Sequence, residues 1–382
     1  MHYRSFPCAP DKKISVLGFG CMRLPHLNND SGQINDEEAL KMVRYAIDNG
    51  VNYIDTAYPY HKGTSEKFVA RALKNGYREK VYLATKHPVW LVEEYADFEK
   101  YLNEQLANLE TDYIDFYMLH ALSAERWQKI RDLGVIKFLE EARAKGKINH
   151  FGFSFHDELA VFKEIINSYP WDFAQIQLNF MDTEYQAGLE GLNYAADRGI
   201  GVIVMEPLRG GSLTRSVPND IKDIWEKAET KRTPAEWCFK WVANHPSVVT
   251  ILSGMSTIEQ VEENVTKADD FLANSLTDFE LELITQVRNI YIERTKVNCT
   301  ACEYCLPCPA GVAIPKVFTL YNNANIYNDL EGASRSYKAF MIEKEIDASK
   351  CVECNKCLSA CPQNIKIPTV LKEAHSYLTK AK

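Results

Sequence analysis

The sequence has no apolar run long enough to span a bilayer, and its first residues, MHYRSFPCAPDKK, lack the apolar core of a signal peptide. We therefore expect a cytoplasmic protein with no membrane partner. An excess of positive charge is also missing: the formal net charge is −8 at pH 7, which argues against nucleic acid as a partner. A glycine-rich fingerprint after the first strand is absent too, which disfavours a doubly wound dinucleotide-binding sheet.

Charge and cysteine are distributed unevenly along the 382 residues. Residues 296–382 carry 11 Lys and Arg against 8 Asp and Glu, which leaves 33 against 44 for the rest of the chain. Eight of the eleven cysteines fall between Cys299 and Cys361, whereas the other three are isolated. In a chain expected in the reducing cytoplasm, such crowding favours metal ligation over disulfides. The sequence therefore predicts a large domain at 1–295 and a small one at 296–382.

Short apolar runs alternate with amphipathic stretches from Ile14 to about Arg294. Apolar strands separated by helices indicate a buried parallel sheet with right-handed crossovers. With one further weak strand, the pattern predicts an α/β fold, a (β/α)8 TIM barrel. The expected strands are 51–56, 80–85, 113–119, 148–154, 173–178, 199–205 and 247–253. Expected helices between them include 36–50, 98–110, 138–147, 188–199, 234–245 and 258–268.

Two segments outside this alternation also carry expectations. We interpret residues 14–24, ISVLGFGCMRL, as a hairpin that closes the lower end of the barrel, with its last residues reaching a site. Residues 312–348 have a helical pattern and are expected to pack the C-terminal segment against the barrel.

Two runs of cysteines carry the strongest chemical signal. They are Cys-x2-Cys-x2-Cys-x2-Cys-Pro from Cys299 to Pro309 and Cys-x2-Cys-x2-Cys-x3-Cys-Pro from Cys351 to Pro362. Three cysteines at this spacing let one loop bind three corners of a 4Fe–4S cubane, and a distant thiolate must bind the fourth. Structural zinc is the alternative, but zinc sites usually use paired CxxC knuckles. The runs predict two 4Fe–4S clusters, used for electron transfer or, alternatively, for structure alone.

The two runs resemble those of two-cluster ferredoxins, in which the fourth cysteine of each run ligates the other cluster. That resemblance implies a small, mostly helical ferredoxin-type domain. The first run departs from the usual bacterial spacing, with two residues instead of three before its last cysteine. Carried over by position, the resemblance assigns Cys299, Cys302, Cys305 and Cys361 to one cluster, and Cys351, Cys354, Cys357 and Cys308 to the other.

Four ionisable residues follow successive expected strands, where a barrel has its active face. They are Asp55 and Tyr60 in YIDTAYPY, Lys86 in LATK and His120 in YMLH. Each alone has an ordinary structural explanation, since strand-end lysines are usually solvated and such histidines usually lie in a core. Their joint placement on three consecutive strands favours a site.

These residues belong to a longer series of motifs. GFGCMRL, IDTAYPY, the strand-end Lys and His, GFSFH, AQIQLN, MEPLRGG and SGMSTIEQVEEN occur in this order. Over about residues 5–290 the sequence resembles the aldo-keto reductases, and the iron–sulfur tail resembles that of a bacterial and archaeal subgroup. The resemblance implies reversible hydride transfer between NAD(P)H and a small carbonyl or alcohol substrate.

Hydride delivery to a carbonyl builds negative charge on oxygen, so a proton donor must lie within hydrogen-bond reach. We expect Tyr60 to be that acid, because a neighbouring Lys86 cation favours ionisation of a phenol. Asp55 would keep Lys86 charged and oriented, and His120 would polarise the substrate oxygen. Tyr58 is an alternative acid whose spacing fits the family less well.

The same resemblance implies a nicotinamide site. Ser154 and Gln175 would hold the carboxamide and Met205 the ring, while Phe155 replaces the family's usual Asn. The remaining expected contacts come from the first loop, a pyrophosphate loop and the adenosine end: Cys21 and Met22; Leu208, Arg209 and Gly210; and Ser253, Gly254, Met255, Gln260, Glu263 and Asn264.

The identity of the cofactor stays open between NADP and NAD. NADPH-preferring relatives carry cations where this sequence has Gly254 and Gln260, and a 2′-phosphate without Arg or Lys loses its strongest partners. FMN in the phosphate site of the barrel is a further alternative. Nicotinamide transfers two electrons as hydride whereas each cluster carries one, so coupling needs a converter such as flavin.

A second function class also stays open: a ferredoxin-type electron-transfer protein, with a redox partner protein, whose barrel serves for docking or regulation. The intact tetrad of ionisable residues counts against it. The substrate cannot be predicted, because the loops that select it vary freely.

Overall fold

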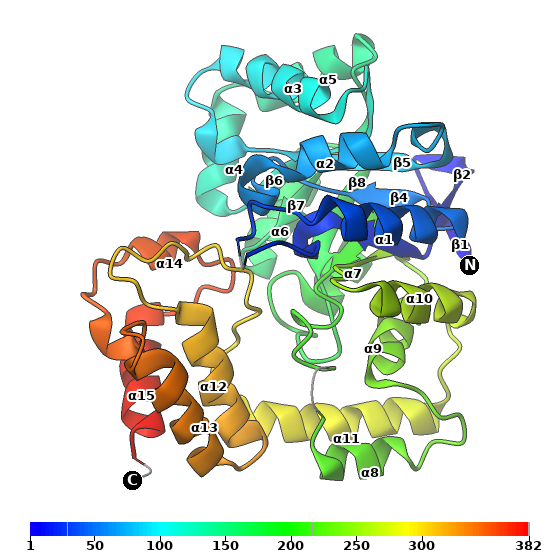
Figure 1. The fold of residues 1–382 in the computed structure, drawn as a ribbon. Helices are drawn as coiled ribbons and strands as arrows, with labels where there is room; N and C mark the ends of the chain where they lie inside the picture. Colours follow the sequence, from blue (N-terminus) through cyan, green and yellow to red (C-terminus); the bar gives the residue numbers. More distant parts are fainter. Residues whose placement is uncertain (29, 215–216, 381–382) are drawn as a thin grey trace. The chain divides into compact units, whose positions relative to one another are not determined.

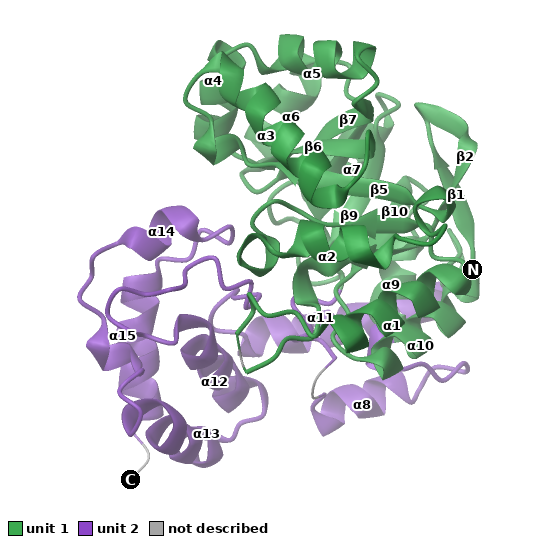
Figure 2. Cartoon of the chain, turned by 45° about the horizontal axis from the view of Figure 1, so that its top comes forward, with its two compact units in different colours: residues 1–207, 236–276 green, residues 208–235, 277–382 purple. Residues whose placement is uncertain are grey.

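The computed structural model describes residues 1–28, 30–214 and 217–380, which form two compact units (Figure 2). Unit 1 comprises Met1–Pro207 and Glu236–Leu276, and unit 2 comprises Leu208–Ala235 and Thr277–Lys382. Unit 2 therefore contains the cysteine-rich segment together with residues 208–235 and 277–295, which precede it in the sequence. The domain division at 295/296 stays a prediction from the sequence.

Unit 1 contains a closed barrel of eight parallel strands (Figure 1). In order around the barrel they are β10 (Val248–Ser253), β3 (Leu17–Gly20), β4 (Tyr53–Asp55), β5 (Tyr82–His87), β6 (Ile114–Leu122), β7 (Ile148–Phe155), β8 (Phe173–Gln177) and β9 (Gly201–Met205). The order follows the chain, as right-handed βα units require. The predicted (β/α)8 barrel and its seven clear strands are confirmed.

The interpretation of residues 14–24 as a hairpin is wrong. Leu17–Gly20 is the first barrel strand, paired with both β10 and β4. The hairpin lies earlier, between β1 (Tyr3–Phe6) and β2 (Ala9–Ser15). Gly18 weakens the sequence pattern that would identify this strand, but the packing requires a glycine there. A Cβ at this position would lie 2.9 Å from Cδ2 of Leu252.

The early hairpin does close one end of the barrel. Phe6 is fully buried, with its ring centroid 4.8 Å from that of Phe116 and 5.8 Å from that of Phe173. Gly201 makes room for it, since a Cβ at that position would lie 2.3 Å from Cδ1 of Phe6. The aromatic plug leaves the opposite end, where the strands finish, for a site.

Helices follow the strands, and several begin at capping residues. Asn35 accepts a hydrogen bond from the backbone N–H of Glu38, and Thr257 does the same for Gln260. The helices of unit 1 are α1 (Asp36–Asp48), α2 (Ser65–Ala72), α3 (Tyr95–Leu109), α4 (Ala124–Asp132), α5 (Val135–Ala144), α6 (Leu159–Ser168), α7 (Gly188–Ala196), α9 (Pro234–Ala243) and α10 (Ile258–Lys267).

Unit 2 is mostly helical, as expected for residues 312–348. Its elements are α8 (Asn219–Trp225), α11 (Asp278–Arg294), α12 (Ile314–Ile326), α13 (Leu330–Tyr337), a π-helical turn η6 (Lys338–Ile342), a 3-10 turn η7 (Ala348–Lys350), α14 (Lys356–Ala360) and α15 (Ile367–Leu378). Helices α12, α13 and α15 lie side by side (Figure 1) around buried Phe318, Tyr337 and Leu371. Among the described residues, no helix has the length and apolar content needed to cross a membrane.

Candidate functional site

Three of the predicted tetrad side chains meet at the ends of neighbouring strands. Lys86, near the end of β5, donates from Nζ to Asp55 Oδ1 at 2.6 Å and to the backbone oxygen of Thr56 at 2.8 Å. The same ammonium lies 3.2 Å from the Tyr60 hydroxyl, which stands at the start of the 3-10 segment η2 (Tyr60–Gly63). All three side chains are buried. The lysine thus contacts both of its predicted partners.

His120 completes the group on β6. Its ring centroid lies 6.0 Å from that of Tyr60, at 80° between the ring planes, and 5.2 Å from that of Trp90 in η4 (Val89–Leu91). Tyr58 takes no part, because its hydroxyl donates to Glu104 Oε2 at 3.1 Å. The structure therefore brings Tyr60 rather than Tyr58 to the lysine.

Burial dominates the electrostatics of the group. It lowers the pKa of Lys86 and raises that of Asp55, and the attraction within the pair opposes both changes. Burial, followed by the Lys86 charge, lowers the pKa of His120 well below its ordinary value. At neutral pH the imidazole is uncharged, so it can offer one N–H to an oxygen without adding a cation.

The residues predicted to hold a nicotinamide come from β7, β8 and β9. Ser154 and Gln175 are partners in the β7–β8 register, and Gln175 Nε2 lies 3.3 Å from the Met205 sulfur. Gln175 Oε1 is buried and has no hydrogen-bond partner among the described residues. Such an atom fits the N–H of a carboxamide. Ser154 Oγ already accepts the N–H of Ala121 at 2.7 Å.

The predicted adenosine end follows β10. Ser253 Oγ accepts from Asn264 Nδ2 at 3.2 Å, and Gln260 Oε1 accepts the N–H of Ser256 at 2.8 Å. Met255 is buried and Glu263 is half-buried. The loop and α10 are therefore fixed to each other before any ligand binds.

A cation that sequence reasoning missed lies at this end. Arg23 belongs to η1 (Cys21–Arg23), and a Cβ on Gly254 would lie 3.1 Å from its Cδ. Its guanidinium is 3.7 Å from a carboxylate oxygen of Glu206. The motif GFGCMRL contained the signal, since this arginine directly follows Cys21 and Met22, which were predicted to face the site. Cys21 is fully buried and Met22 half-buried.

The expected pyrophosphate loop belongs to unit 2 and is described within it. Arg209 is buried and donates to Asn298 Oδ1 at 2.6 Å, directly before Cys299. Gly210 has a φ of 66°, and the N–H of Gly211 donates to the oxygen of Leu208 at 2.9 Å. This tight turn is thus joined to the beginning of the first cysteine run.

The eight clustered cysteines surround two cavities in unit 2. One is lined by Cys299, Cys302, Cys305 and Cys361, and the other by Cys308, Cys351, Cys354, Cys357 and also Cys305. Each cavity combines thiols of one run with the last cysteine of the other. Burial and the neighbouring thiols raise the pKa of Cys305 and of Cys357. Four convergent thiols around a hollow fit a cluster whose iron ions would neutralise them.

Two family models match this sequence. One, described as the aldo/keto reductase family, matches residues 16–288, and the other, a 4Fe-4S dicluster domain, matches residues 298–365. The chain belongs to the aldo/keto reductase family. It is an oxidoreductase of that family, and its aldo/keto reductase region is followed by a C-terminal dicluster domain.

Individual relatives agree with this assignment. The uncharacterized oxidoreductase YqkF of Bacillus subtilis is 27% identical over 72% of this chain and 92% of its own length. The NADH-specific methylglyoxal reductase of Escherichia coli is 26% identical over 67% and 90%. The holo structure of aldo-keto reductase AKR11C1 from Bacillus halodurans is 28% identical over 75% and 96%, with a TM-score of 0.63.

Proposed function

We propose that this aldo/keto reductase catalyses reversible reduction of a small carbonyl compound by NAD(P)H, with Tyr60 as the general acid. The observation that carries the proposal is the contact of one buried ammonium, on Lys86, with both the Asp55 carboxylate and the Tyr60 hydroxyl. A proton donor, a cation and its counter-ion are the groups that carbonyl reduction needs in one place.

The reduced nicotinamide, when bound, supplies hydride to the carbonyl carbon. Tyr60 donates its hydroxyl proton to the carbonyl oxygen, so that the products are an alcohol and the oxidised cofactor. Lys86 stabilises the negative charge left on the phenol oxygen, and Asp55 fixes the lysine. Neutral His120 donates an N–H to the substrate oxygen, and Trp90 beside it forms an apolar wall for the substrate.

The nicotinamide would lie against Met205, with its carboxamide at Ser154 and Gln175. The unpartnered Gln175 Oε1 supports this placement, because the carboxamide N–H₂ is a donor. We assign the adenosine end of the cofactor to Ser253, Gly254, Met255, Gln260, Glu263 and Asn264, and a further cofactor contact to Cys21 and Met22 of the first loop. The pyrophosphate contact of Leu208, Arg209 and Gly210, which belong to unit 2, stays a prediction from the sequence.

The choice between NADPH and NADH depends on Arg23 in this proposal. Its side chain packs on Gly254, where the sequence itself offers no cation for a 2′-phosphate. A guanidinium is the strongest side-chain partner for that group. The Glu206 carboxylate competes with a 2′-phosphate for the Arg23 guanidinium. In addition, one relative is by name NADH-specific. Both cofactors are therefore included.

The dicluster domain would exchange single electrons with a redox partner protein. We assign Cys299, Cys302, Cys305 and Cys361 to one cluster and Cys351, Cys354, Cys357 and Cys308 to the other, and the lining of the two cavities supports this crossed ligation. Cys354 is the exposed cysteine of the set, so the second cluster is the expected exit for electrons. FMN is the candidate converter between one-electron and two-electron chemistry.

The reaction type can be tested with cofactor that carries deuterium at both C4 positions, so that hydride from either face is labelled. Purified holoprotein is incubated with deuterated NADPH or NADH and 4-nitrobenzaldehyde, and the alcohol is analysed by mass spectrometry. We expect one deuterium on the carbinol carbon for each cofactor oxidised. Alcohol without deuterium, or cofactor oxidation without alcohol, would contradict direct hydride transfer.

Coupling to the clusters needs a separate measurement. Anaerobic titration of the protein with NADPH or NADH, followed near 400 nm, reports whether the clusters are reduced, and the flavin content of the same sample is determined. Bleaching together with bound flavin would support the coupled enzyme. Turnover with aldehyde and no bleaching would assign the clusters to a separate role.

A further inference from the structure

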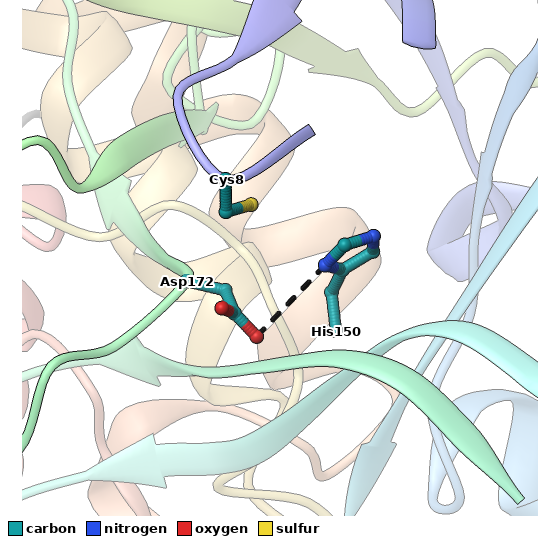
Figure 3. A group of neighbouring side chains, drawn as sticks. All are labelled: Cys8, His150 and Asp172. Carbon is teal, nitrogen blue, oxygen red and sulfur yellow. Dashed lines mark ion pairs between the residues drawn. The ribbon is translucent and has the colours of Figure 1, made fainter. Parts of the chain in front are cut away.

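A second group of ionisable side chains lies at the opposite end of the barrel from the tetrad. Cys8 is in the turn between β1 and β2, His150 is near the beginning of β7, and Asp172 directly precedes β8 (Figure 3). One donor atom of each, sulfur, nitrogen and oxygen, lies within 4.8 Å of the other two. The three residues come from remote parts of the sequence and converge only in the fold.

The spacing suits a metal ion. Tetrahedral Zn²⁺ binds sulfur at about 2.3 Å and nitrogen or oxygen at about 2.0–2.2 Å, which places its ligand atoms roughly 3.5 Å apart. His150 Nδ1 is 3.9 Å from Asp172 Oδ2, so a small contraction would close the site. A mixed sulfur, imidazole and carboxylate set favours Zn²⁺ over the hard cations Mg²⁺ and Ca²⁺.

The surroundings hold two of the three ligands in place. The N–H of Phe151 donates to Asp172 Oδ2 at 2.9 Å, and the Arg143 guanidinium donates to the same oxygen. These contacts fix the carboxylate, as outer partners of metal ligands commonly do. The His150 ring stacks on Phe116, with centroids 5.1 Å apart and 24° between the planes.

We propose that Cys8, His150 and Asp172 bind one Zn²⁺ ion, with water as the fourth ligand, and that the ion fastens the β1–β2 hairpin to the barrel. The thiolate and the carboxylate bring two negative charges to the ion, and the Arg143 cation bonded to the carboxylate offsets one of them. The role is structural, because the active sites of such barrels lie at the other end, where the tetrad is. The hairpin carries Phe6, so the ion would hold the aromatic plug in place.

The test uses anaerobically purified protein with both clusters intact. Zinc bound per chain is measured by equilibrium dialysis and elemental analysis, and the ligands are identified by X-ray absorption at the zinc edge. We expect one equivalent of zinc with one sulfur and three nitrogen or oxygen neighbours. Cys8→Ser should lose the sulfur neighbour and about 100-fold or more in affinity. Asp11→Asn, in the same hairpin, should bind like the wild type.

Each other outcome contradicts the site. Zinc with four sulfur neighbours would show that it occupies cluster cysteines instead. Protein that contains the iron of its clusters but binds no zinc would exclude this site. Equal zinc affinity of the wild type and Cys8→Ser would exclude Cys8 as a ligand. His150→Gln gives a second check, since it should weaken binding while Cys8 remains as the sulfur neighbour.

Discussion

The tetrad of the barrel and the cysteine-rich segment hold their reactive groups in different ways. In the barrel, Lys86 is buried and bonded to Asp55, Thr56 and Tyr60, all from the protein itself. In the dicluster domain, eight half-buried or exposed thiols face two cavities. The barrel site is complete as a set of protein groups before its cofactor binds, whereas the interior of the dicluster domain requires the inorganic cluster.

The cores reflect the same difference. The barrel has an aromatic interior that includes Phe6, Phe116 and Phe173. The dicluster domain has a core of its own, and six of the clustered cysteines pack against it. A small domain with few apolar side chains usually needs metals or disulfides for stability. Four predictions test this difference between the barrel and the dicluster domain.

Removal of iron should have the largest effect. Because cluster binding contributes directly to folding, an anaerobic chelator should abolish amide protection in residues 297–380 and leave the barrel strands protected. Hydrogen exchange with mass spectrometry measures both regions in one sample. Equal protection of residues 297–380 with and without iron would remove the contrast between the two regions.

Lys86→Met should be the most damaging single substitution in the barrel. It leaves the Asp55 carboxylate buried without its cation, at a cost of about 3–5 kcal/mol in the free energy of unfolding. The control is Lys80→Met, since Lys80 forms an exposed pair with Asp48 and should contribute about 0–1 kcal/mol. Urea unfolding compares the two variants. A similar small loss in both would mean that the buried pair is not required.

The barrel should lose stability as the pH falls from 7.5 to 5.5. Burial lowers the pKa of His87 to about 4, so the folded state keeps the ring neutral while the unfolded chain binds a proton below about pH 6.5. The contribution of His87 to the free energy of unfolding is therefore fully present at pH 7.5 and decreases by about 1.3 kcal/mol by pH 5.5. Urea unfolding of His87→Phe at both pH values should show a correspondingly weaker pH dependence.

Arg23→Leu should act on cofactor choice alone. If the guanidinium holds a 2′-phosphate, kcat/KM falls about tenfold with NADPH and stays unchanged with NADH, which corresponds to about 1.4 kcal/mol. Arg44→Leu is a suitable control, since Arg44 is on α1 and donates to Ala72. An equal loss with both cofactors would assign Arg23 to the structure of the loop.

Much of the barrel was predictable because its strands are apolar throughout and its helices amphipathic. The strand Leu17–Gly20 escaped because two of its four residues are glycines, which carry no periodic signal. The dicluster domain was predictable because the spacing of its cysteines is local. Arg23 was not predicted as part of the cofactor site, because it meets Gly254 only through a tertiary contact between residues more than two hundred positions apart.

The group of Cys8, His150 and Asp172 was beyond sequence reasoning for the same reason. Cys8 is an isolated cysteine in the sequence, and neither partner lies near it. The tetrad differs, since the strand order itself places successive strand ends side by side. Local spacing and strand order can be predicted from sequence, whereas contacts between remote loops cannot.

The central claim, Tyr60 as the general acid, is tested most directly by comparing Tyr60→Phe with Tyr58→Phe. Both remove one hydroxyl from the same loop, but the Tyr58 hydroxyl bonds to Glu104 rather than to Lys86. We predict that kcat for aldehyde reduction falls about 10²–10⁴-fold in Tyr60→Phe and stays near wild type in Tyr58→Phe, with cofactor binding and iron content unchanged in both. Full activity of Tyr60→Phe would contradict the account.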